Sequence, residues 1–152
     1  MGKVVITGVE TPLGRRVARL VAEEEDADVV GLAAGPVAGL PARVAVYRVD
    51  LSGDDVKPHL QDADVLVHLA TSVPATPTAA TDDVTVTRRV LEAAGDGSVP
   101  HLVVLSSATV YGAWPDNPVP LTEEDPVRGN EEFAYSHHKR LVEEQLAALR
   151  SA

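Results

Sequence analysis

Short apolar runs alternate with helix-like segments along most of this chain, and this alternation constrains the fold more than any other feature. The runs that we expect to form strands cover residues 3–7, 28–32, 43–49, 64–69 and 101–106. Apolar residues at helical spacing predict helices over residues 12–24, 54–60, 82–94 and 131–149. Alternating strands and helices form βαβ units, so we expect an α/β fold: a doubly wound parallel sheet of about five strands, with helices on both faces.

Segments rich in proline, glycine, alanine or threonine separate these elements. We expect loops over residues 33–42, 71–81 and 113–130. The prolines of the last segment exclude regular structure there. The chain has no internal repeat, and its 152 residues are enough for one domain with a sizeable core. We therefore expect residues 1–152 to form a single domain.

Charge and composition argue against several classes of partner. The formal net charge is −10 and no basic patch is visible, so we expect neither nucleic acid nor a membrane surface as a partner. The absence of cysteine excludes disulfides and thiol catalysis. With no signal peptide and no apolar run long enough to span a bilayer, we expect a cytoplasmic protein. His137 and His138 are adjacent and point to different faces of a helix, so we expect no metal site.

Tyr135 and Lys139 suggest chemistry more directly than any other pair in the chain. They are four residues apart on the predicted helix 131–149, so their side chains share one face. An ammonium group beside a phenol favours the phenolate form, which suits proton transfer. Ser107, at the end of strand 101–106, would complete an acid–base site for a carbonyl/alcohol pair. The alternative is that Tyr135 only packs and Lys139 is a solvated helix lysine.

Polar and small residues recur at the carboxyl ends of the predicted strands. Thr7-Gly8, Asp50, Leu69-Ala70 and Ser106-Ser107 all lie there. Ligands of open parallel sheets bind at this edge.

These segments together resemble the extended short-chain dehydrogenase/reductase family, in its NAD-dependent epimerase/dehydratase branch. Residues 7–14 approximate the family's TGxxGxxG motif, and Asp50 with Leu51 matches its acid after the third strand. Residues 68–70 match its fourth-strand signature, residues 106–112 match its serine motif, and Tyr135 and Lys139 match its YxxxK motif. The resemblance covers the whole chain but only the amino-terminal half of family members. We therefore expect their carboxyl-terminal, substrate-binding part to be absent.

The resemblance implies a Rossmann-like domain that binds NAD or NADP and transfers hydride at a small hydroxyl/carbonyl substrate, such as a nucleotide sugar. It implies that Tyr135 is the general acid/base, that Lys139 holds the nicotinamide ribose, and that Ser107 polarises the substrate oxygen. The residues that it implies for cofactor binding are Gly8, Thr11, Pro12, Leu13, Gly14, Asp50, Leu51, Leu69, Ala70, Tyr135 and Lys139.

The glycine loop departs from the family motif. Thr11 replaces the middle glycine, Pro12 removes an N–H that usually donates to phosphate, and Glu10 adds a negative charge. We expect these changes to weaken cofactor binding. An equally physical interpretation is that Pro12 simply begins a helix, because proline is favoured at the first helical position.

Two further departures concern the cofactor. The second strand ends in residues 33–36, which offer neither an acid that selects NAD nor a base that selects NADP, so the preference is not indicated. Asp83 and Val86 stand where the family usually has asparagine and glycine.

Three functional interpretations follow. The chain is the catalytic Rossmann domain of an epimerase, dehydratase or reductase, a non-catalytic nucleotide-sensing or protein-interaction module, or an inactive fragment of a longer enzyme. The resemblance also implies a homodimer through the apolar stripes of helices 82–94 and 131–149. The alternative is that these stripes only cover their own sheet.

Overall fold

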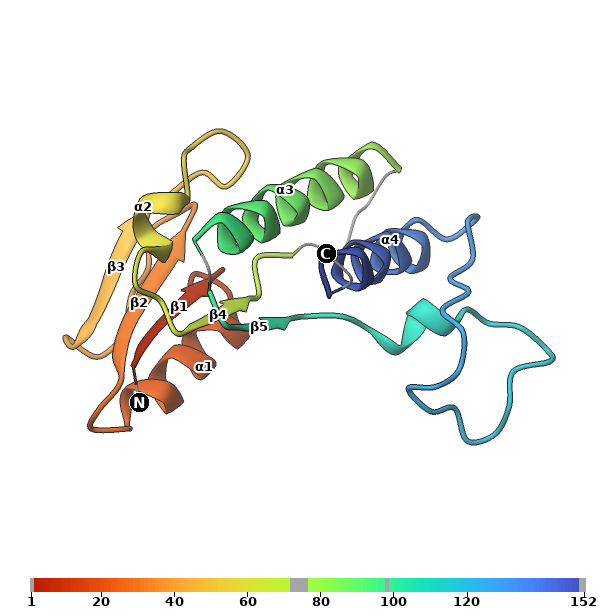
Figure 1. The fold of residues 1–152 in the computed structure, drawn as a ribbon, viewed down its shortest axis with the longest axis horizontal. Helices are drawn as coiled ribbons and strands as arrows, with labels where there is room; N and C mark the ends of the chain where they lie inside the picture. Colours follow the sequence, from red (N-terminus) through yellow and green to blue (C-terminus); the bar gives the residue numbers. More distant parts are fainter. Residues whose placement is uncertain (1, 72–76, 98, 151–152) are drawn as a thin grey trace. The chain divides into compact units, whose positions relative to one another are not determined.

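The computed structural model describes residues 2–71, 77–97 and 99–150, and it confirms a Rossmann-like α/β fold (Figure 1). The chain forms two compact units. The first consists of Met1–Thr71 and Arg89–Leu105, and the second of Ser72–Arg88 and Ser106–Ala152.

The first unit holds the whole sheet. Its five parallel strands are β1 (Lys3–Thr7), β2 (Asp28–Ala33), β3 (Val44–Arg48), β4 (Val65–His68) and β5 (His101–Val104), in the order β3-β2-β1-β4-β5. Val5 lies opposite Val30 on one side and Leu66 on the other. The strand order reverses between β1 and β4, and this point is where open α/β sheets bind ligands.

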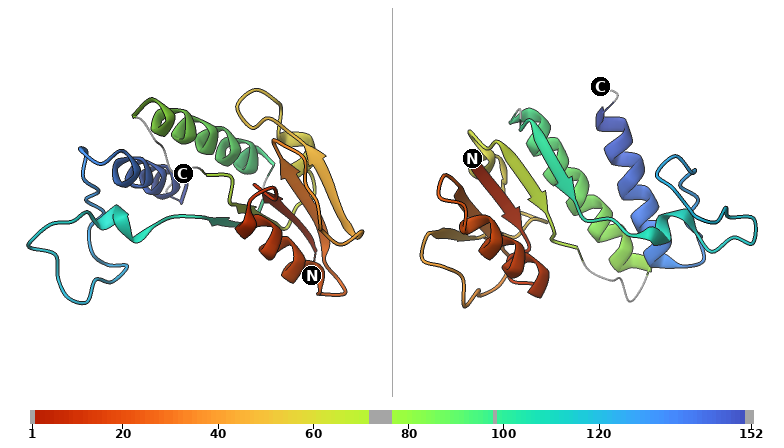
Figure 2. Two further views of the ribbon diagram at one scale, coloured as in Figure 1. Left: turned by 180° about the vertical axis from the view of Figure 1, so that it is seen from behind. Right: turned by 90° about the horizontal axis from the view of Figure 1, so that it is seen from below.

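Helices cover both faces of the sheet. Helix α1 (Pro12–Ala22) packs on one face, where Val4, Ile6 and Val29 point. The short helix α2 (Lys57–Leu60) and the last part of α3 (Pro77–Asp96) pack on the other face (Figure 2). Because successive residues of a strand point to opposite faces, each central strand supplies side chains to both cores.

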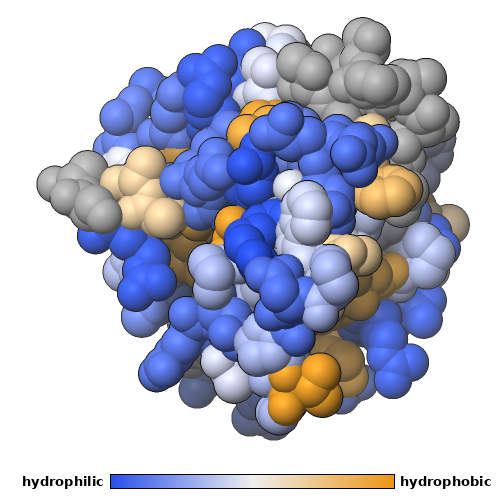
Figure 3. All heavy atoms as spheres, turned by 90° about the vertical axis from the view of Figure 1, so that its right-hand side faces the viewer, coloured by the Kyte–Doolittle hydropathy of each residue, from blue (hydrophilic) through white to orange (hydrophobic). Residues whose placement is uncertain are grey.

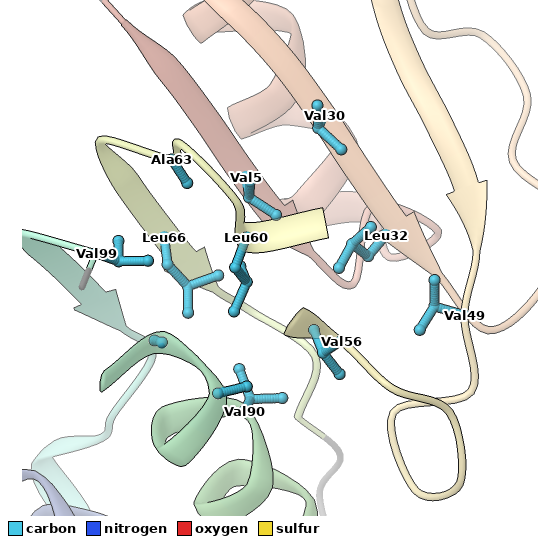
Figure 4. Close-up of a cluster of buried hydrophobic side chains, with 12 residues drawn as sticks. Val5, Val30, Leu32, Val49, Val56, Leu60, Ala63, Leu66, Val90 and Val99 are labelled. Atoms are coloured by element: carbon cyan, nitrogen blue, oxygen red, sulfur yellow. The ribbon is translucent and has the colours of Figure 1, made fainter. Parts of the chain in front are cut away.

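The core beneath α2 and α3 consists of aliphatic side chains. Figure 4 shows Val5, Leu32 and Leu66 of the sheet facing Leu60 of α2 and Val90 of α3. Leu60, Leu66 and Val90 are completely buried. Aromatic residues are only 3% of the chain, so the branched aliphatic residues Val and Leu provide most of the packing here.

All four predicted helices are present, but their boundaries differ from the prediction: α1 ends at Ala22 rather than 24, α4 begins at Ala134 rather than 131, and α2 and α3 differ more. Helix α3 begins at Pro77, so the prediction of a loop through residue 81 is wrong for residues 77–81, and residues 72–76 lie outside the described part. Proline is tolerated in the first turn of a helix, because its missing N–H would have no intrahelical acceptor there. Helix α2 is a single turn rather than the predicted 54–60, since Asp54 and Asp55 instead accept N–H bonds from Asp50 and Lys57 in the preceding turn.

The second unit contains the helix that carries the YxxxK motif. This helix, α4, runs from Ala134 to Arg150, and a 3₁₀ turn, η1 (Ala108–Tyr111), follows β5. Residues 112–133 form neither helix nor strand, which confirms the predicted proline-rich loop.

The structure bears on two expected absences. Within the described ranges, no helix is long and apolar enough to cross a membrane. In the same ranges, no group of three or more His, Asp or Glu side chains is arranged to hold a metal ion.

Part of the predicted dimer stripe is already buried within one chain. Val90 packs in the sheet core, and Leu91 and Val142 are also buried. Leu141, Leu146 and Leu149 of α4 are half-buried and would remain for a partner. The homodimer stays a prediction.

We expect Leu66→Ala to lower the free energy of unfolding by about 2–5 kcal/mol, because it leaves a cavity at the centre of the sheet core. Urea denaturation measures this change. Leu20→Ala is the matched control, because Leu20 of α1 is 52% exposed whereas Leu66 is fully buried. The control should change stability by less than about 0.5 kcal/mol. Equal effects of the two substitutions would contradict the assigned core.

Candidate functional site

The turn between β1 and α1 depends on two glycines. Gly8 has φ +75°, a left-handed conformation that glycine adopts without strain. A Cβ on Gly8 would lie 2.7 Å from the Ala70 nitrogen, so the loop packs directly against the backbone that follows β4. A Cβ on Gly14 would collide with the Gly8 carbonyl oxygen. Both glycines therefore allow the close backbone packing that the dinucleotide-binding turn requires.

Thr11 serves as the N-cap of α1. Its hydroxyl accepts the Gly14 N–H at 3.0 Å and donates to the Gly8 carbonyl at 2.8 Å. Pro12 occupies the first helical position, and its lack of an N–H costs the helix nothing. The Leu13 N–H lies in the first turn of α1, where backbone N–H groups have no intrahelical acceptor. The loop is thus a well-made turn that retains a main-chain donor for an anion.

The hydroxyl of Thr7 connects the end of β1 to the end of β4 by hydrogen bonds. Its buried hydroxyl accepts the N–H groups of Leu69 and Ala70, each at 3.2 Å, and lies 2.8 Å from the Nδ1 of His68. These two N–H groups therefore already have an acceptor within the protein. The Leu69 side chain packs in the core beneath α1, so a ligand meets this segment mainly through its backbone.

Asp50 is exposed and oriented at the end of β3. Its Oδ1 accepts the Ser52 N–H at 2.9 Å and the Ser52 hydroxyl at 2.6 Å. These two hydrogen bonds hold the pKa of the Asp50 carboxyl below its usual value. The neighbouring Leu51 packs its side chain partly against the sheet core. Asp50 is therefore an ionised hydrogen-bond acceptor at the carboxyl edge of the sheet.

Ser107 begins the 3₁₀ turn in the second unit. Its half-buried hydroxyl caps η1 by accepting the Thr109 N–H at 3.3 Å, and it also accepts the Thr109 hydroxyl at 3.0 Å. Both bonds use lone pairs of the Ser107 oxygen. The Ser107 proton therefore remains available for donation to another oxygen.

Tyr135 and Lys139 share one face of α4, as predicted. The Lys139 ammonium lies 5.8 Å from the centre of the Tyr135 ring. Lys139 is only 1% exposed, whereas Tyr135 is half-buried. Burial lowers the pKa of the Lys139 ammonium, and the carboxylates of Asp83 and Glu143 oppose this shift.

A pocket of about 430 Å³ connects the serine motif with Tyr135. Its lining combines apolar and polar groups of the second unit: Ala108, Thr109, Gly112, Ala113, Asn130, Phe133, Tyr135 and Ser136. The structure therefore places the Tyr135 side chain and the segment that follows Ser107 on one small-molecule-sized cavity.

Ser136 connects two of the segments that line this pocket to α4. Its buried hydroxyl donates to the Thr109 carbonyl at 2.7 Å and accepts the Asn130 N–H at 2.9 Å. One side chain of α4 is thereby bonded to both the 3₁₀ turn and the end of the proline-rich loop. The sequence analysis missed this role, because a serine inside YxxxK gives no local signal of partners so far away in the chain.

The proline-rich loop is held by a hydrogen-bond network. The Trp114 indole donates to the Arg128 carbonyl at 2.7 Å, and the Arg128 guanidinium pairs with Asp116 at 2.9 Å and bonds to Asn117 at 2.7 Å. Gly112 has φ +71°, and a Cβ there would collide with the Trp114 ring. The glycine of the serine motif is therefore required by the loop beside the pocket.

A buried contact between a histidine and a carboxylate lies next to Lys139 in the chain. The His138 Nε2 is 2.9 Å from the Asp83 Oδ2, and His138 is completely buried. The sequence analysis recorded Asp83 only as a departure from asparagine, whereas the structure gives it a partner on α4.

On the face of the molecule seen in Figure 3, hydrophilic residues dominate and hydrophobic residues form small separate groups. Phe133, which lines the pocket of the second unit, is 60% exposed. The pocket therefore includes an apolar side chain that is open to solvent.

A family model described as the NAD dependent epimerase/dehydratase family matches residues 4–152. The chain belongs to this family. No curated protein matches the sequence at a significant level.

Solved structures of epimerases and dehydratases share the fold. MoeE5, solved with UDP-glucose and NAD, is 25% identical, with a TM-score of 0.82 over 99% of this chain and 50% of its own. TunA, an NAD-dependent NDP-hexosamine 5,6-dehydratase, is 23% identical, with a TM-score of 0.81 over 99% of this chain and 50% of its own. The UDP-glucuronic acid 4-epimerase of Bacillus cereus is 20% identical, with a TM-score of 0.81 over 98% of this chain and 52% of its own. This member of the epimerase/dehydratase family therefore spans about half the length of these structures.

We expect Lys139→Met to raise the free energy of unfolding at pH 7. Burial lowers the Lys139 pKa, so the folded protein binds this proton more weakly than the unfolded chain, and the buried charge costs stability at neutral pH. Wild-type stability should recover as the pH rises between the lowered pKa and the ordinary value of 10.5. The advantage of the variant, measured by urea denaturation, should therefore shrink across that window.

Lys57→Met is the matched control. Lys57 is exposed and forms a 2.7 Å ion pair with Asp96, which raises the pKa of Lys57. Its replacement should slightly lower stability at pH 7, with the opposite sign to Lys139→Met. A Lys139→Met protein that is less stable than the wild type at pH 7 would contradict the assigned cost of burial.

Proposed function

We propose that this chain is a catalytic Rossmann domain of an NAD-dependent epimerase or dehydratase that acts on a nucleotide sugar. The observation that carries the proposal is the shared pocket of the serine motif and Tyr135, with a buried Lys139 on the same helix face. Family membership and the nucleotide-sugar ligand of MoeE5 support the substrate class.

The proposed proton transfer uses three side chains of the second unit. The Tyr135 phenol, as phenolate, accepts the proton of a substrate hydroxyl, or donates it back to a carbonyl oxygen. The Lys139 ammonium stabilises the phenolate by its positive charge. Ser107 donates its free proton to the same substrate oxygen and stabilises the charge that develops there.

The residues of the first unit fit a dinucleotide. The Leu13 N–H at the start of α1 suits a phosphate, Gly8 allows close approach, and the ionised Asp50 offers an acceptor for the adenine side. When bound, NAD supplies the acceptor and donor of hydride. Tyr135 and Lys139 would contact the nicotinamide ribose, as the family motif implies.

A non-catalytic nucleotide-sensing module is the second candidate, and the loop chemistry favours it. The Thr11 hydroxyl already accepts the Gly14 N–H, and Pro12 has no N–H. Fewer main-chain donors are therefore left for pyrophosphate. A chain that binds NADH but converts no nucleotide sugar would support this candidate over the first.

We expect Tyr135→Phe to lower kcat by about 10²–10⁴-fold with UDP-glucose, UDP-glucuronic acid or UDP-N-acetylglucosamine as substrate, because it removes the general acid/base. The dissociation constant for NADH, measured by calorimetry, should change less than about threefold, since one hydroxyl contact is lost. Tyr47→Phe is the control: Tyr47 lies exposed on β3 and should keep full activity. Full activity of Tyr135→Phe would contradict the assigned mechanism.

We expect Pro12→Ala to tighten NADH binding about tenfold, because it restores a main-chain donor to a charged phosphate. Calorimetric titration gives both dissociation constants. Pro58→Ala, which makes the same change in the first turn of α2, should leave NADH affinity unchanged. If Pro12→Ala binds NADH with unchanged affinity, pyrophosphate binding does not depend on a main-chain N–H at this position.

A further inference from the structure

The end of β2 lacks the acid that dinucleotide-binding folds usually place there. In such folds, an Asp or Glu about 20 residues beyond the glycine loop binds the adenosine ribose hydroxyls and selects NAD. In this chain β2 ends at Ala33, and Ala34, Gly35 and Pro36 follow. No carboxylate is available from this segment itself.

Glu10 brings a carboxylate to this place from the glycine loop. Its Oε1 accepts the Ala34 N–H at 3.2 Å, so the side chain reaches from the turn after β1 to the end of β2. The Arg15 guanidinium donates to the Glu10 carbonyl oxygen at 3.0 Å, which holds the main chain of the same residue. The carboxylate thus contacts the backbone just after β2, the segment from which the usual acid is missing.

The Glu10 carboxylate has capacity for another donor. Among the described residues, its Oε2 is buried and has no hydrogen-bond partner. A carboxylate offers about four lone-pair positions, and a buried acceptor without a donor is costly. The side chain as a whole is only half-buried, and Oε1 accepts the single N–H of Ala34, which leaves Oε1 a lone pair for a ligand hydroxyl. A hydroxyl donor from a ligand would complete this group.

We propose that Glu10 replaces the missing acid, accepts a hydrogen bond from an adenosine ribose hydroxyl, and selects NAD(H) over NADP(H). This inference rests on the proposed dinucleotide binding. An ionised carboxylate accepts a ribose hydroxyl but repels the phosphate dianion that NADP carries on that ribose. Glu10, which by sequence alone only adds negative charge to the loop, thereby becomes the specificity determinant of the cofactor site.

Two arginines of the first unit would favour the opposite cofactor preference, for NADP over NAD. Arg48 lies opposite Ala33 in the sheet register and is exposed, and Arg15 lies on the first turns of α1. A guanidinium near the ribose would favour the phosphate of NADP. The Arg15 group is bonded to the Glu10 main chain, whereas the Glu10 carboxylate itself is bonded to the end of β2. We therefore expect the carboxylate to dominate.

Calorimetric titrations of the wild type, Glu10→Gln and Glu10→Ala with NADH, NADPH and ADP-ribose test the proposal. The wild type should bind NADH at least about tenfold more tightly than NADPH. Glu10→Gln keeps an acceptor oxygen but removes the charge, so NADH affinity should change less than about threefold while NADPH affinity rises about tenfold. Glu10→Ala should weaken ADP-ribose binding as well, because the acceptor is lost.

Glu23→Gln provides the matched control. It removes one negative charge at the other end of α1, where Glu23 is exposed at the C-cap, and should leave the NADH/NADPH ratio unchanged. Thermal melts of all variants check that each is folded.

The outcomes separate this inference from the proposed function. A wild type that prefers NADPH, or a Glu10→Gln protein with an unchanged NADH/NADPH ratio, overturns the role of Glu10 and leaves dinucleotide binding intact. A folded wild type that binds neither NADH nor ADP-ribose at millimolar concentration overturns both.

Discussion

The hydroxyl of Thr7 joins the carboxyl ends of the two central strands, and the turn that follows is built on this junction. It accepts two N–H groups from the segment after β4, so its own proton must go to the Nδ1 of His68. Gly8 is the next residue and packs against Ala70, so the position of the glycine loop depends on the same contact. A side chain without an acceptor here would leave two buried N–H groups without a partner.

The second unit buries polar side chains around the residues to which we assign proton transfer, and this burial is unfavourable. Lys139 is almost completely buried, and the adjacent His138 pairs with Asp83 in the interior. A buried ammonium such as that of Lys139 rarely adds stability, because desolvation offsets its attraction to nearby carboxylates. The retention of such a group beside Tyr135 is typical of sites in which stability is given up for activity. Ser136 offsets part of this loss of stability, since its hydroxyl forms hydrogen bonds that connect two other segments to α4.

The elements that sequence predicted well are those whose signal is local. The continuous aliphatic runs of β1, β2 and β4 indicate strands of a buried sheet, and four-residue spacing places Tyr135 and Lys139 on one face. The start of α3 was missed because Pro77 looks like a loop residue when only its neighbours are considered. Glu10, Ser136 and Asp83 were missed for another reason: their partners lie far along the chain, so no local pattern reveals them. From the sequence, Thr11 and Pro12 depart from the glycine motif and Pro12 can begin a helix, but the capping hydrogen bonds of Thr11 are seen only in the structure.

The loop beside the pocket contains the chain's single tryptophan, and its indole N–H is bonded to the Arg128 carbonyl. All tryptophan fluorescence of this protein therefore originates from one ring in one loop. Emission wavelength and polarisation would report on the hydration and motion of that loop, without an added label. Trp114 is thus an intrinsic fluorescent probe next to the pocket in which we propose that the reaction takes place.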